Sequence, residues 1–287
     1  MSVDFAAAAD FMLREARLLD RARFAFLFGD GSAGAVLAAL VPYRNDDGGF
    51  GNALEPDIRG PSSQTVPVEH ALRMLDEIGR FDDRIVGAAC NWLTSVSAEG
   101  GGVSFVLRTV EDGPHAPWWE PTGRASVNPT AGVAGLLHKR EFEHPWLRAA
   151  TTYCWDALPA AVAELGQDDT ISVLVFLEHV PDRDRAQELF AAVGARVLEV
   201  VALDPDTPGY VKSPLDYAPR PDSLARLLFD DATIDVHLEA LAARQQDDGG
   251  WPITWEPPST AAVSEWRGYH TVRALQVLDE YGRLEPR

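Results

Sequence analysis

The sequence predicts an all-α fold and, within that class, an α/α toroid: a closed barrel of inner and outer helices with about five to six helical hairpins. The segment Asp-Asp-Gly-Gly-Phe at 46–50 returns as Asp-Asp-Gly-Gly-Trp at 247–251. Each copy leads to Leu-x-x-Leu-Asp-Glu-x-Gly-Arg, at 72–80 and at 275–283. A repeated turn-and-helix unit buries its apolar face by stacking on further copies. Because open arrays usually have atypical polar ends, the near-identical first and last units predict a ring that closes.

The composition predicts one globular domain over residues 1–287. Of the 287 residues, 46% are hydrophobic, and no Gly/Ser-rich or charged run marks a linker. The formal net charge of -19 argues against nucleic acid or an anionic membrane surface as a partner, because both would be repelled. No apolar run approaches the roughly 20 residues of a membrane span, and residues 1–10 lack the features of a signal peptide. We therefore expect a cytoplasmic protein.

In the first half of the chain, helical spacing of apolar residues predicts four helices. A long Ala-rich helix ends where Gly29 and Gly31 follow it, and a short apolar one leads into the first glycine turn. Glu99-Gly100-Gly101-Gly102 is predicted to be a degenerate third copy of that turn. The expected helices are 5–28, 33–40, one beginning near 63–65, and 82–95.

In the second half, Asn128-Pro129-Thr130 predicts an N-cap with proline at the first helical position. The apolar run 171–177 resembles a strand, but a lone strand has no partner among helices, so we expect a helix there. The expected helices are 131–138, 145–165, one through 171–177, 182–201, 222–228, 231–245 and a last one after the second glycine turn.

Neither a metal nor a cofactor is expected. The two cysteines, Cys90 and Cys154, lie in separate helical segments, which predicts buried inert thiols and neither a disulfide nor a zinc site. The histidines lack ligand spacing. No glycine-rich phosphate loop and no Gly-x-Ser-x-Gly motif occur, so nucleotide-binding and serine-hydrolase functions are excluded.

Two motifs resemble those of the terpenoid cyclase and protein prenyltransferase toroids. The segment Arg-Gln-Gln-Asp-Asp-Gly-Gly-Trp at 244–251 is similar to the Gln-to-Trp repeats of squalene-hopene and oxidosqualene cyclases, and 46–50 is a second, weaker match. Gly-Gln-Asp-Asp-Thr-Ile at 166–171 resembles the Asp-x-Asp-Asp-Thr-Ala motif that opens an inner helix in class II cyclases. Gly166 stands where that motif has its first aspartate.

The resemblance implies a terpenoid-cyclase-like enzyme that acts on an isoprenoid or similar small apolar substrate by acid-initiated carbocation chemistry in a central cavity. Asp168 would donate the proton, with Asp169 as its partner, because one ionised carboxylate raises the pKa of its neighbour. An aspartate at the start of a helix also serves as an N-cap, so capping is the alternative role for this pair.

The expected substrate site lies on the loops that lead onto inner helices and on the first turns of those helices. Aromatic faces there would stabilise a carbocation by about 0.5 to 2 kcal/mol each. The same rings would otherwise pack loops onto the barrel. The expected substrate-binding residues are Glu55, Asp57, Arg59, Gln64, Trp118, Trp119, Tyr217, Trp255, Trp266, Arg267 and Tyr269.

Two other functions fit the same sequence. One is a non-catalytic toroid that binds a lipid or a peptide. The other is a glycan-processing α/α barrel that uses Glu55 or Asp57 with a second carboxylate about 5 to 10 Å away. The oligomeric state is left open.

Overall fold

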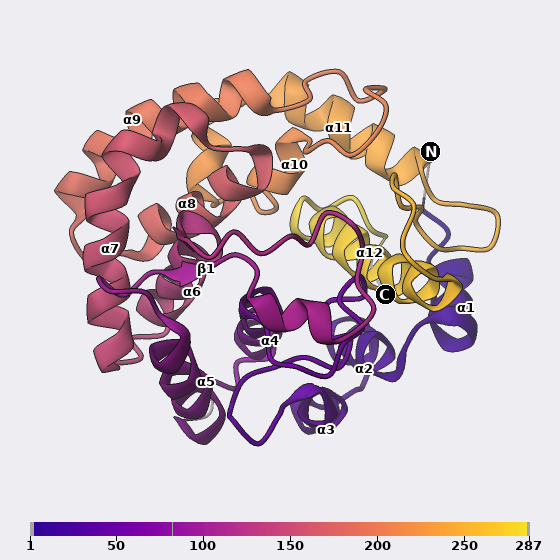
Figure 1. The fold of residues 1–287 in the computed structure, drawn as a ribbon. Helices are drawn as coiled ribbons and strands as arrows, with labels where there is room; N and C mark the ends of the chain where they lie inside the picture. The colour runs from indigo at the N-terminus through magenta and orange to yellow at the C-terminus, as the bar shows by residue number, and fades with distance from the viewer. Residues whose placement is uncertain (1–2, 82, 286–287) are drawn as a thin grey trace. The chain divides into compact units, whose positions relative to one another are not determined.

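The computed structural model describes residues 3–81 and 83–285, and most of this chain is helical (Figure 1). The predicted all-α class is therefore confirmed. The α-helices are α1 (Phe5–Glu15), α2 (Leu18–Phe28), α3 (Ala33–Leu40), α4 (Thr65–Glu77), α5 (Asp83–Val96), α6 (Val127–Lys139), α7 (Pro145–Ala161), α8 (Gln167–His179), α9 (Arg183–Val200), α10 (Pro214–Tyr217), α11 (Asp231–Ala243) and α12 (Thr260–Glu280). Four 3-10 turns are η1 (Val41–Tyr43), η2 (Arg108–Asp112), η3 (Val162–Glu164) and η4 (Leu224–Leu228). Two short strands, β1 (Val103–Ser104) and β2 (Ala125–Ser126), pair antiparallel.

The contacts of the chain divide it into two compact units. The central unit comprises residues 40–200, and the terminal unit comprises residues 1–39 together with 201–287. The first and last helices thus belong to the same unit, and Figure 1 shows the indigo α1 beside the yellow α12. A single domain over 1–287 stays a prediction.

In the central unit, α6 and α8 make the most extensive helix–helix contact among the described residues. Small residues allow this approach: a Cβ at Gly135 would lie 2.5 Å from the Val175 carbonyl oxygen. Helix α8 buries Val173, Phe176 and Leu177, so the apolar run 171–177 is helical, as predicted. Helix α6 also contacts α4 and α7, and α8 contacts α9.

In the terminal unit, α12 contacts α1, α2 and α11. The apolar faces of α1 and α12 meet in a core cluster to which α2 adds two partly buried side chains. The buried members are Phe11, Met12, Ala16 and Val272, and Phe24 and Leu27 pack against them.

The prediction of one helix over 5–28 is wrong, because the chain is extended at Ala16 and Arg17 and turns back there. Both α1 and α2 contact α12, so the chain has to reverse between them. Side chains stabilise the break: Arg17 pairs with the buried Asp20 at 2.6 Å, and the Arg21 Nε donates to the Ala16 carbonyl oxygen at 2.7 Å. Neither glycine nor proline marks this turn, which is why apolar spacing did not reveal it.

The three glycine turns share one backbone geometry. In each, the first glycine of the pair has a left-handed φ and donates its N–H to the residue three positions before it. The pairs are Gly48 (φ 94°) with Asn45 at 3.0 Å, Gly101 (φ 96°) with Ala98 at 3.0 Å, and Gly249 (φ 92°) with Gln246 at 2.8 Å. The degenerate third copy of the turn is therefore confirmed.

Each glycine pair also packs on a helix in the same way. The first glycine contacts the backbone of an alanine in that helix, and the second contacts the aromatic ring of the residue four positions after the alanine. A Cβ on the first glycine would overlap the alanine, and one on the second would overlap the ring. The contacts are Gly48 with Ala88 (2.6 Å), Gly101 with Ala149 (2.6 Å), Gly249 with Ala7 (2.0 Å), Gly49 with Trp92, Gly102 with Tyr153 and Gly250 with Phe11 (2.7 Å each).

The helix that receives the turn differs at the end of the chain. The turn before α4 packs on α5, and the turn before α6 packs on α7. In both cases the turn packs on the helix that follows the one it leads into. The turn before α12 packs on α1. The Gln245 side chain reinforces this contact, because it accepts from the Asp4 N–H and donates to the Asp4 and Gly249 carbonyl oxygens, at 2.8, 2.8 and 3.0 Å. Asp4 is the N-cap of α1, so the last turn holds the first helix at its start.

Candidate functional site

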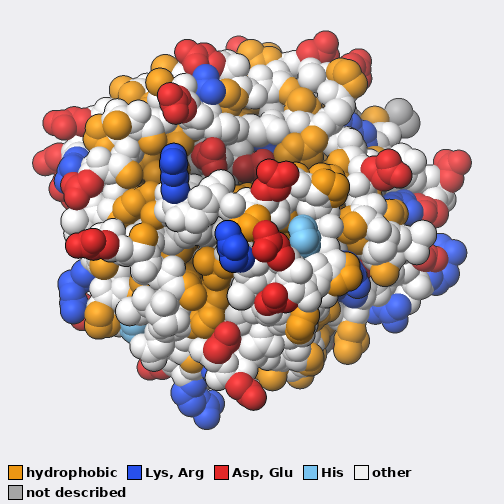
Figure 2. All heavy atoms as spheres, in the orientation of Figure 1, with side chains coloured by type: hydrophobic (Ala, Val, Ile, Leu, Met, Phe, Trp, Pro, Cys, Tyr) orange, Lys and Arg blue, Asp and Glu red, His pale blue; other side chains and the backbone are white. Residues whose placement is uncertain are grey.

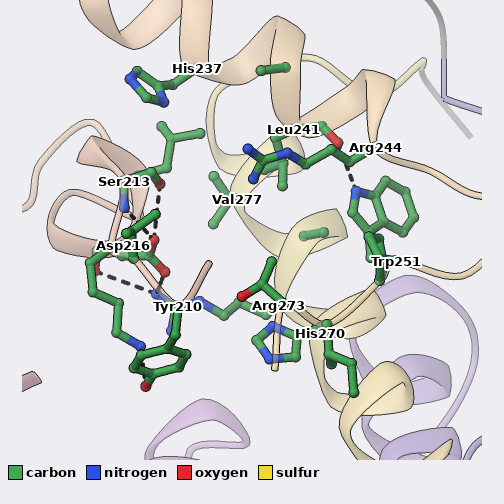
Figure 3. Close-up of a pocket in the computed structure, with 18 of the residues that line it drawn as sticks. Tyr210, Ser213, Asp216, His237, Leu241, Arg244, Trp251, His270, Arg273 and Val277 are labelled. Atoms are coloured by element: carbon green, nitrogen blue, oxygen red, sulfur yellow. Dashed lines mark hydrogen bonds and ion pairs between the residues drawn. The ribbon is translucent and has the colours of Figure 1, made fainter. Parts of the chain in front are cut away.

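A pocket of about 150 Å³ lies in the terminal unit (Figure 3). Its walls come from α10, α11 and α12, from the segment 210–213, and from the segment 251–255 that follows the last glycine turn. This volume equals that of roughly five liquid water molecules, at about 30 Å³ each. The pocket therefore suits a short branched group or a small head group.

An ion pair forms one side of the pocket. Asp216 lies in the single turn of α10, where its Oδ2 accepts hydrogen bonds from the Ser213 N–H (2.8 Å) and Oγ (2.9 Å). Its Oδ1 pairs with Arg273 of α12 at 3.2 Å (Figure 3). The two Ser213 hydrogen bonds form a capping box, which fixes the carboxylate on its short helix.

The pKa values keep this pair charged. Burial raises the pKa of Asp216, but the charges of Arg273 and Lys212, with the Ser213 hydrogen bonds, outweigh it, so the pKa lies below its ordinary value. Burial also lowers the pKa of Arg273, and Asp216 and Tyr269 more than offset that effect. The pocket thus contains an ionised carboxylate and an ionised guanidinium at neutral pH.

His270 lies one turn before Arg273 on α12 and also lines the pocket. Burial, followed by the charges of Arg273 and Lys212, lowers its pKa from 6.5 to about 3, although the nearby Asp216 and Asp20 act in the opposite direction. The imidazole is therefore neutral at physiological pH. Its Nε2 is buried and has no hydrogen-bond partner among the described residues.

Aromatic rings surround His270 on several sides. The centroids of Trp255, Trp266 and Tyr269 lie 5.5, 5.7 and 5.6 Å from that of the imidazole. Tyr210 extends the cluster, because its ring lies 5.4 Å from Trp255 in an edge-to-face arrangement. We call Tyr210, Trp255, Trp266 and Tyr269 the aromatic cluster.

A fully buried carboxylate lies behind the cluster. Asp20 of α2 is fully buried and pairs with Arg17 at 2.6 Å and with Arg23 at 2.9 Å. The Arg23 guanidinium lies 5.2 Å from the centroid of the Tyr269 ring. Because cations stacked on rings hold both groups in place, this network fixes the back of the cluster.

The pocket carries an excess of positive charge. Lys212, Arg244 and Arg273 line it together with one carboxylate, Asp216. The whole chain, in contrast, has a net charge of -19, and acidic side chains are spread over the face shown in Figure 2. This local reversal of sign would favour an anionic group inside the pocket.

Among the predicted substrate-binding residues of this unit, Trp255, Trp266 and Tyr269 come together in the aromatic cluster. Tyr217 is buried next to Asp216 in α10. Arg267 instead belongs to the glycine turn: its guanidinium pairs with both carboxylate oxygens of Asp248 at 2.7 Å and lies over the Phe11 ring. Its observed contacts are therefore those of a residue that braces the turn.

In the central unit, the predicted carboxylates lie in the loop before α4. Glu55 and Asp57 are both 2% exposed, and the Glu55 Oε2 accepts the Asp57 N–H at 2.8 Å. Arg59 donates to the Pro56 carbonyl oxygen at 3.3 Å. Gln64 joins the start of α4 to η2 and its N-cap, because its Oε1 accepts the Leu107 N–H at 2.9 Å and its Nε2 donates to the Thr109 hydroxyl. These contacts hold the loop together.

The two adjacent tryptophans of the central unit differ in exposure. Trp119 is buried and stacks on Phe105 at 5.1 Å, whereas Trp118 is 49% exposed. Trp119 belongs to a core cluster with Ile58, Val66, Val106, Val110 and Ala116. Trp119 thus packs its loop onto the unit.

Asp168 and Asp169 begin α8, as the motif predicts. The Asp169 Oδ2 accepts the Gly166 N–H at 3.0 Å, so Asp169 forms part of a capping interaction. Asp168 is half-buried in the same turn. Proton donation by Asp168 stays a prediction.

Sequence reasoning missed Asp216, Arg273 and the role of His270. The sequence patterns that mark these residues are short-range ones. Ser213-Pro214-x-Asp216 is a capping-box pattern, and 266, 269, 270, 273 and 277 recur at the helical spacing of one face of α12. The partner segment 210–213 approaches that face only in the folded chain.

No group of three or more potential metal ligands occurs in residues 3–81 and 83–285. Within the same residues, no helix is long and apolar enough to cross a membrane. Cys90 and Cys154 are buried free thiols, and burial raises the pKa of Cys90 to about 12 and that of Cys154 above its ordinary range.

No family model and no curated protein matches this chain. A solved structure described as that of a protein from Actinoplanes is similar, with a TM-score of 0.62 and 18% sequence identity. The similarity covers 96% of this chain and 98% of that one. At this identity, the similarity concerns the fold alone.

Proposed function

We propose that this protein is a terpenoid-cyclase-like enzyme with an α/α-toroid fold, and that the pocket of the terminal unit binds a short isoprenoid-like group of its substrate. The observation that carries the proposal is the aromatic cluster around a neutral His270. Indole and phenol faces pack against unsaturated chains and attract a developing carbocation.

Two groups of the pocket favour this chemistry, whereas the positive charges of Lys212, Arg244 and Arg273 oppose it. With its pKa lowered to about 3, His270 adds no positive charge beside a cation. It is also too weak a base to compete for the proton that starts the reaction. The ionised Asp216 would attract the cation.

The toroid itself is supported by the three equivalent glycine turns. Each turn precedes one helix and packs on another, as expected for repeated hairpins. At the end of the chain, α1 takes the place that α5 and α7 take at the earlier turns. A closed ring requires such a contact between the first and last units.

For the acid step we propose Asp168 of the central unit. The capping hydrogen bond at the start of α8 is made by Asp169. The resemblance of 166–171 to the cyclase motif assigns the proton to Asp168, the middle aspartate. The acid and the pocket belong to different units, so each is tested by its own variant.

The test is incubation with C15 to C30 isoprenoids and analysis for cyclised products. We expect Asp168→Asn to abolish product formation without loss of binding. We expect Trp255→Ala to weaken binding about tenfold, and Leu227→Ala, at an exposed side chain of the same unit that does not line the pocket, to leave it unchanged.

The outcomes separate the candidate functions. Equal turnover by Asp168→Asn removes Asp168 from the mechanism. Binding without turnover of any isoprenoid favours the non-catalytic toroid. If no isoprenoid binds, the proposal is rejected.

A further inference from the structure

We propose that the segment 202–212 is a strap that closes the pocket of the terminal unit, and that a ligand enters or leaves this pocket when the strap opens. The strap forms one wall of the pocket through Tyr210, Val211 and Lys212. The proposal rests on the proposed function in that it concerns the same pocket. It describes how that pocket is reached and requires no reaction there.

The strap is a loop that can move as one piece. The Ala202 N–H donates to the Lys212 carbonyl oxygen at 2.9 Å, so the two ends of the strap lie side by side. Between them, Asp204 holds a local turn: its Oδ1 accepts the Asp206 N–H at 2.9 Å, and its carbonyl oxygen accepts the Thr207 hydroxyl at 2.7 Å. A compact surface loop whose ends meet is an Ω-loop. Such a loop can swing about its ends and keep its internal hydrogen bonds.

The strap has no side chain in the core. None of residues 202–212 is buried, and Tyr210 and Val211 are 45% and 37% exposed although they line the pocket. Segments that bury little apolar surface open at a lower free energy than the rest of a protein. Every other wall contains a buried residue: Leu215 in α10, His237 in α11, Trp251 in the segment 251–255, and Val277 in α12. The strap is therefore the wall that opens first.

Side chains from α11 and its C-cap hold the strap closed. The His237 Nε2 lies 3.0 Å from the Leu203 carbonyl oxygen and donates to it, since a carbonyl oxygen only accepts. Arg244, the C-cap of α11, donates to the Pro205 carbonyl oxygen. We call His237 and Arg244 the latch. Both also line the pocket (Figure 3), so the strap is fastened at the edge of the pocket itself.

The inner lining explains why an opening is needed. Leu215, Trp251 and Val277 are 5%, 2% and 4% exposed. A ligand that packs on these apolar side chains has to reach surface that is almost fully enclosed. One wall therefore has to move, and the wall without a buried side chain moves at the lowest cost.

Thiol labelling measures this opening without any ligand. Val277→Cys places a thiol in the pocket wall, and Val272→Cys places one in the same helix but in the core cluster with Phe11. We expect iodoacetamide to label Val277→Cys about tenfold faster than Val272→Cys, because the strap opens more often than the unit unfolds. Peptide mapping separates these labels from those of the buried native thiols, Cys90 and Cys154.

Variants of the latch then show whether the strap controls the labelling. We expect Arg244→Ala and His237→Leu each to speed the labelling of Val277→Cys about threefold to tenfold, the factor that corresponds to one net hydrogen bond. His237→Gln keeps a side-chain donor and should restore most of the original rate. Arg14→Ala removes an exposed arginine of α1 that pairs with Asp10, away from the pocket, and should leave the rate unchanged.

Two results would overturn the strap. Equal labelling rates of Val277→Cys and Val272→Cys would mean that the pocket is reached only by unfolding. A rate for Val277→Cys that neither Arg244→Ala nor His237→Leu changes would mean that the ligand enters elsewhere. Circular dichroism identifies variants that fail to fold. Ala274→Cys, at another lining residue of α12, then replaces Val277→Cys, and the exposed Arg244 replaces His237.

Binding kinetics separate the strap from the proposed function. With farnesol as the isoprenoid, we expect Arg244→Ala to raise the association and dissociation rates about equally and to leave Kd nearly unchanged, because the latch closes the pocket in both the free and the bound protein. A change in Kd with no change in the association rate would make Arg244 a ligand contact and would contradict the strap. If farnesol does not bind at all, the proposed function fails, and the labelling rates alone decide on the strap.

Discussion

Ala7 and Gly249 are in backbone contact although they lie near opposite ends of the chain. A Cβ on Gly249 would lie 2.0 Å from the Ala7 carbonyl oxygen, closer than any real contact. Two constraints therefore require glycine at position 249: the left-handed φ of 92°, which a side chain disfavours, and the backbone of α1, which leaves no room for a Cβ. The last repeat of the chain therefore depends on the first helix for its packing.

The equivalent contact at the middle glycine turn, between Gly101 and Ala149, allows the cost of the packing to be separated from the cost of the backbone conformation. Gly100 and Gly101 have φ values of 99° and 96°, but only Gly101 meets a neighbour, the Ala149 backbone. We expect Gly100→Ala to cost about 1 to 2 kcal/mol from the left-handed backbone alone. Gly101→Ala should cost about 1 to 3 kcal/mol more because of overpacking. Urea denaturation measures both, and equal losses would contradict the packing role.

The contact of Gln245 with Asp4 predicts a second effect on stability. Gln245→Ala removes two hydrogen bonds to Asp4 at the start of α1 and one to Gly249 within the turn, so we expect a loss of about 1 to 3 kcal/mol. The side chain of the neighbouring Gln246 is exposed and donates to the Arg244 carbonyl oxygen, and its backbone hydrogen bonds survive truncation, so Gln246→Ala should change the free energy of unfolding by less than about 0.5 kcal/mol. Faster amide exchange in α1 of the Gln245→Ala variant would locate the loss, and identical stabilities of the two variants would refute it.

The sequence predicted the elements that have a periodic or chemical signature. The glycine turn at 99–102 was found because its glycines match those of the other copies, and the helix at 171–177 because no strand partner was present. Helix boundaries at Ala33 and Asp83 followed the apolar pattern closely.

What the sequence could not predict depends on contacts between distant segments. The break at Ala16 follows from packing on α12, and no local residue announces it. The pocket required the segment 210–213 and α12 to meet, so neither Asp216 nor Arg273 was selected from the sequence. Trp255 and Trp266 were selected because aromatic residues in the loops and on the first turns of the inner helices were singled out in the sequence, and in the structure the two rings lie 5.1 Å apart.

The ion pair between Asp216 and Arg273 predicts coupling between two variants. Asp216→Asn leaves the guanidinium without its counter-charge, so we expect a loss of about 1 to 2 kcal/mol, moderated because both side chains are partly exposed. Arg273→Gln should cost a similar amount. Because each removes the same pair, the double variant should lose less than the sum. Strictly additive losses in urea denaturation would show that the pair contributes nothing.

His270 predicts a dependence of stability on pH between about 3 and 6.5. The pKa in the folded protein is lowered to about 3, whereas that of an unfolded histidine is about 6.5. In this range the unfolded state holds one proton more, so the free energy of unfolding falls as pH falls, by at most about 1.4 kcal/mol per pH unit. The lowered pKa of Asp216 acts in the same direction, but only near and below the ordinary pKa of an aspartate.

Comparison of the wild type with His270→Phe isolates this contribution, because His138 and His144, whose pKa values burial also lowers, are present in both proteins. We expect the stability of the variant to fall less steeply from about pH 6.5 to about pH 4.5. The imidazole Hε1 signal of His270 should show no titration over the same range, since the ring stays neutral above its folded pKa. A titration midpoint near 6.5 would show that His270 is solvated like an ordinary histidine and would remove the neutral imidazole from the pocket.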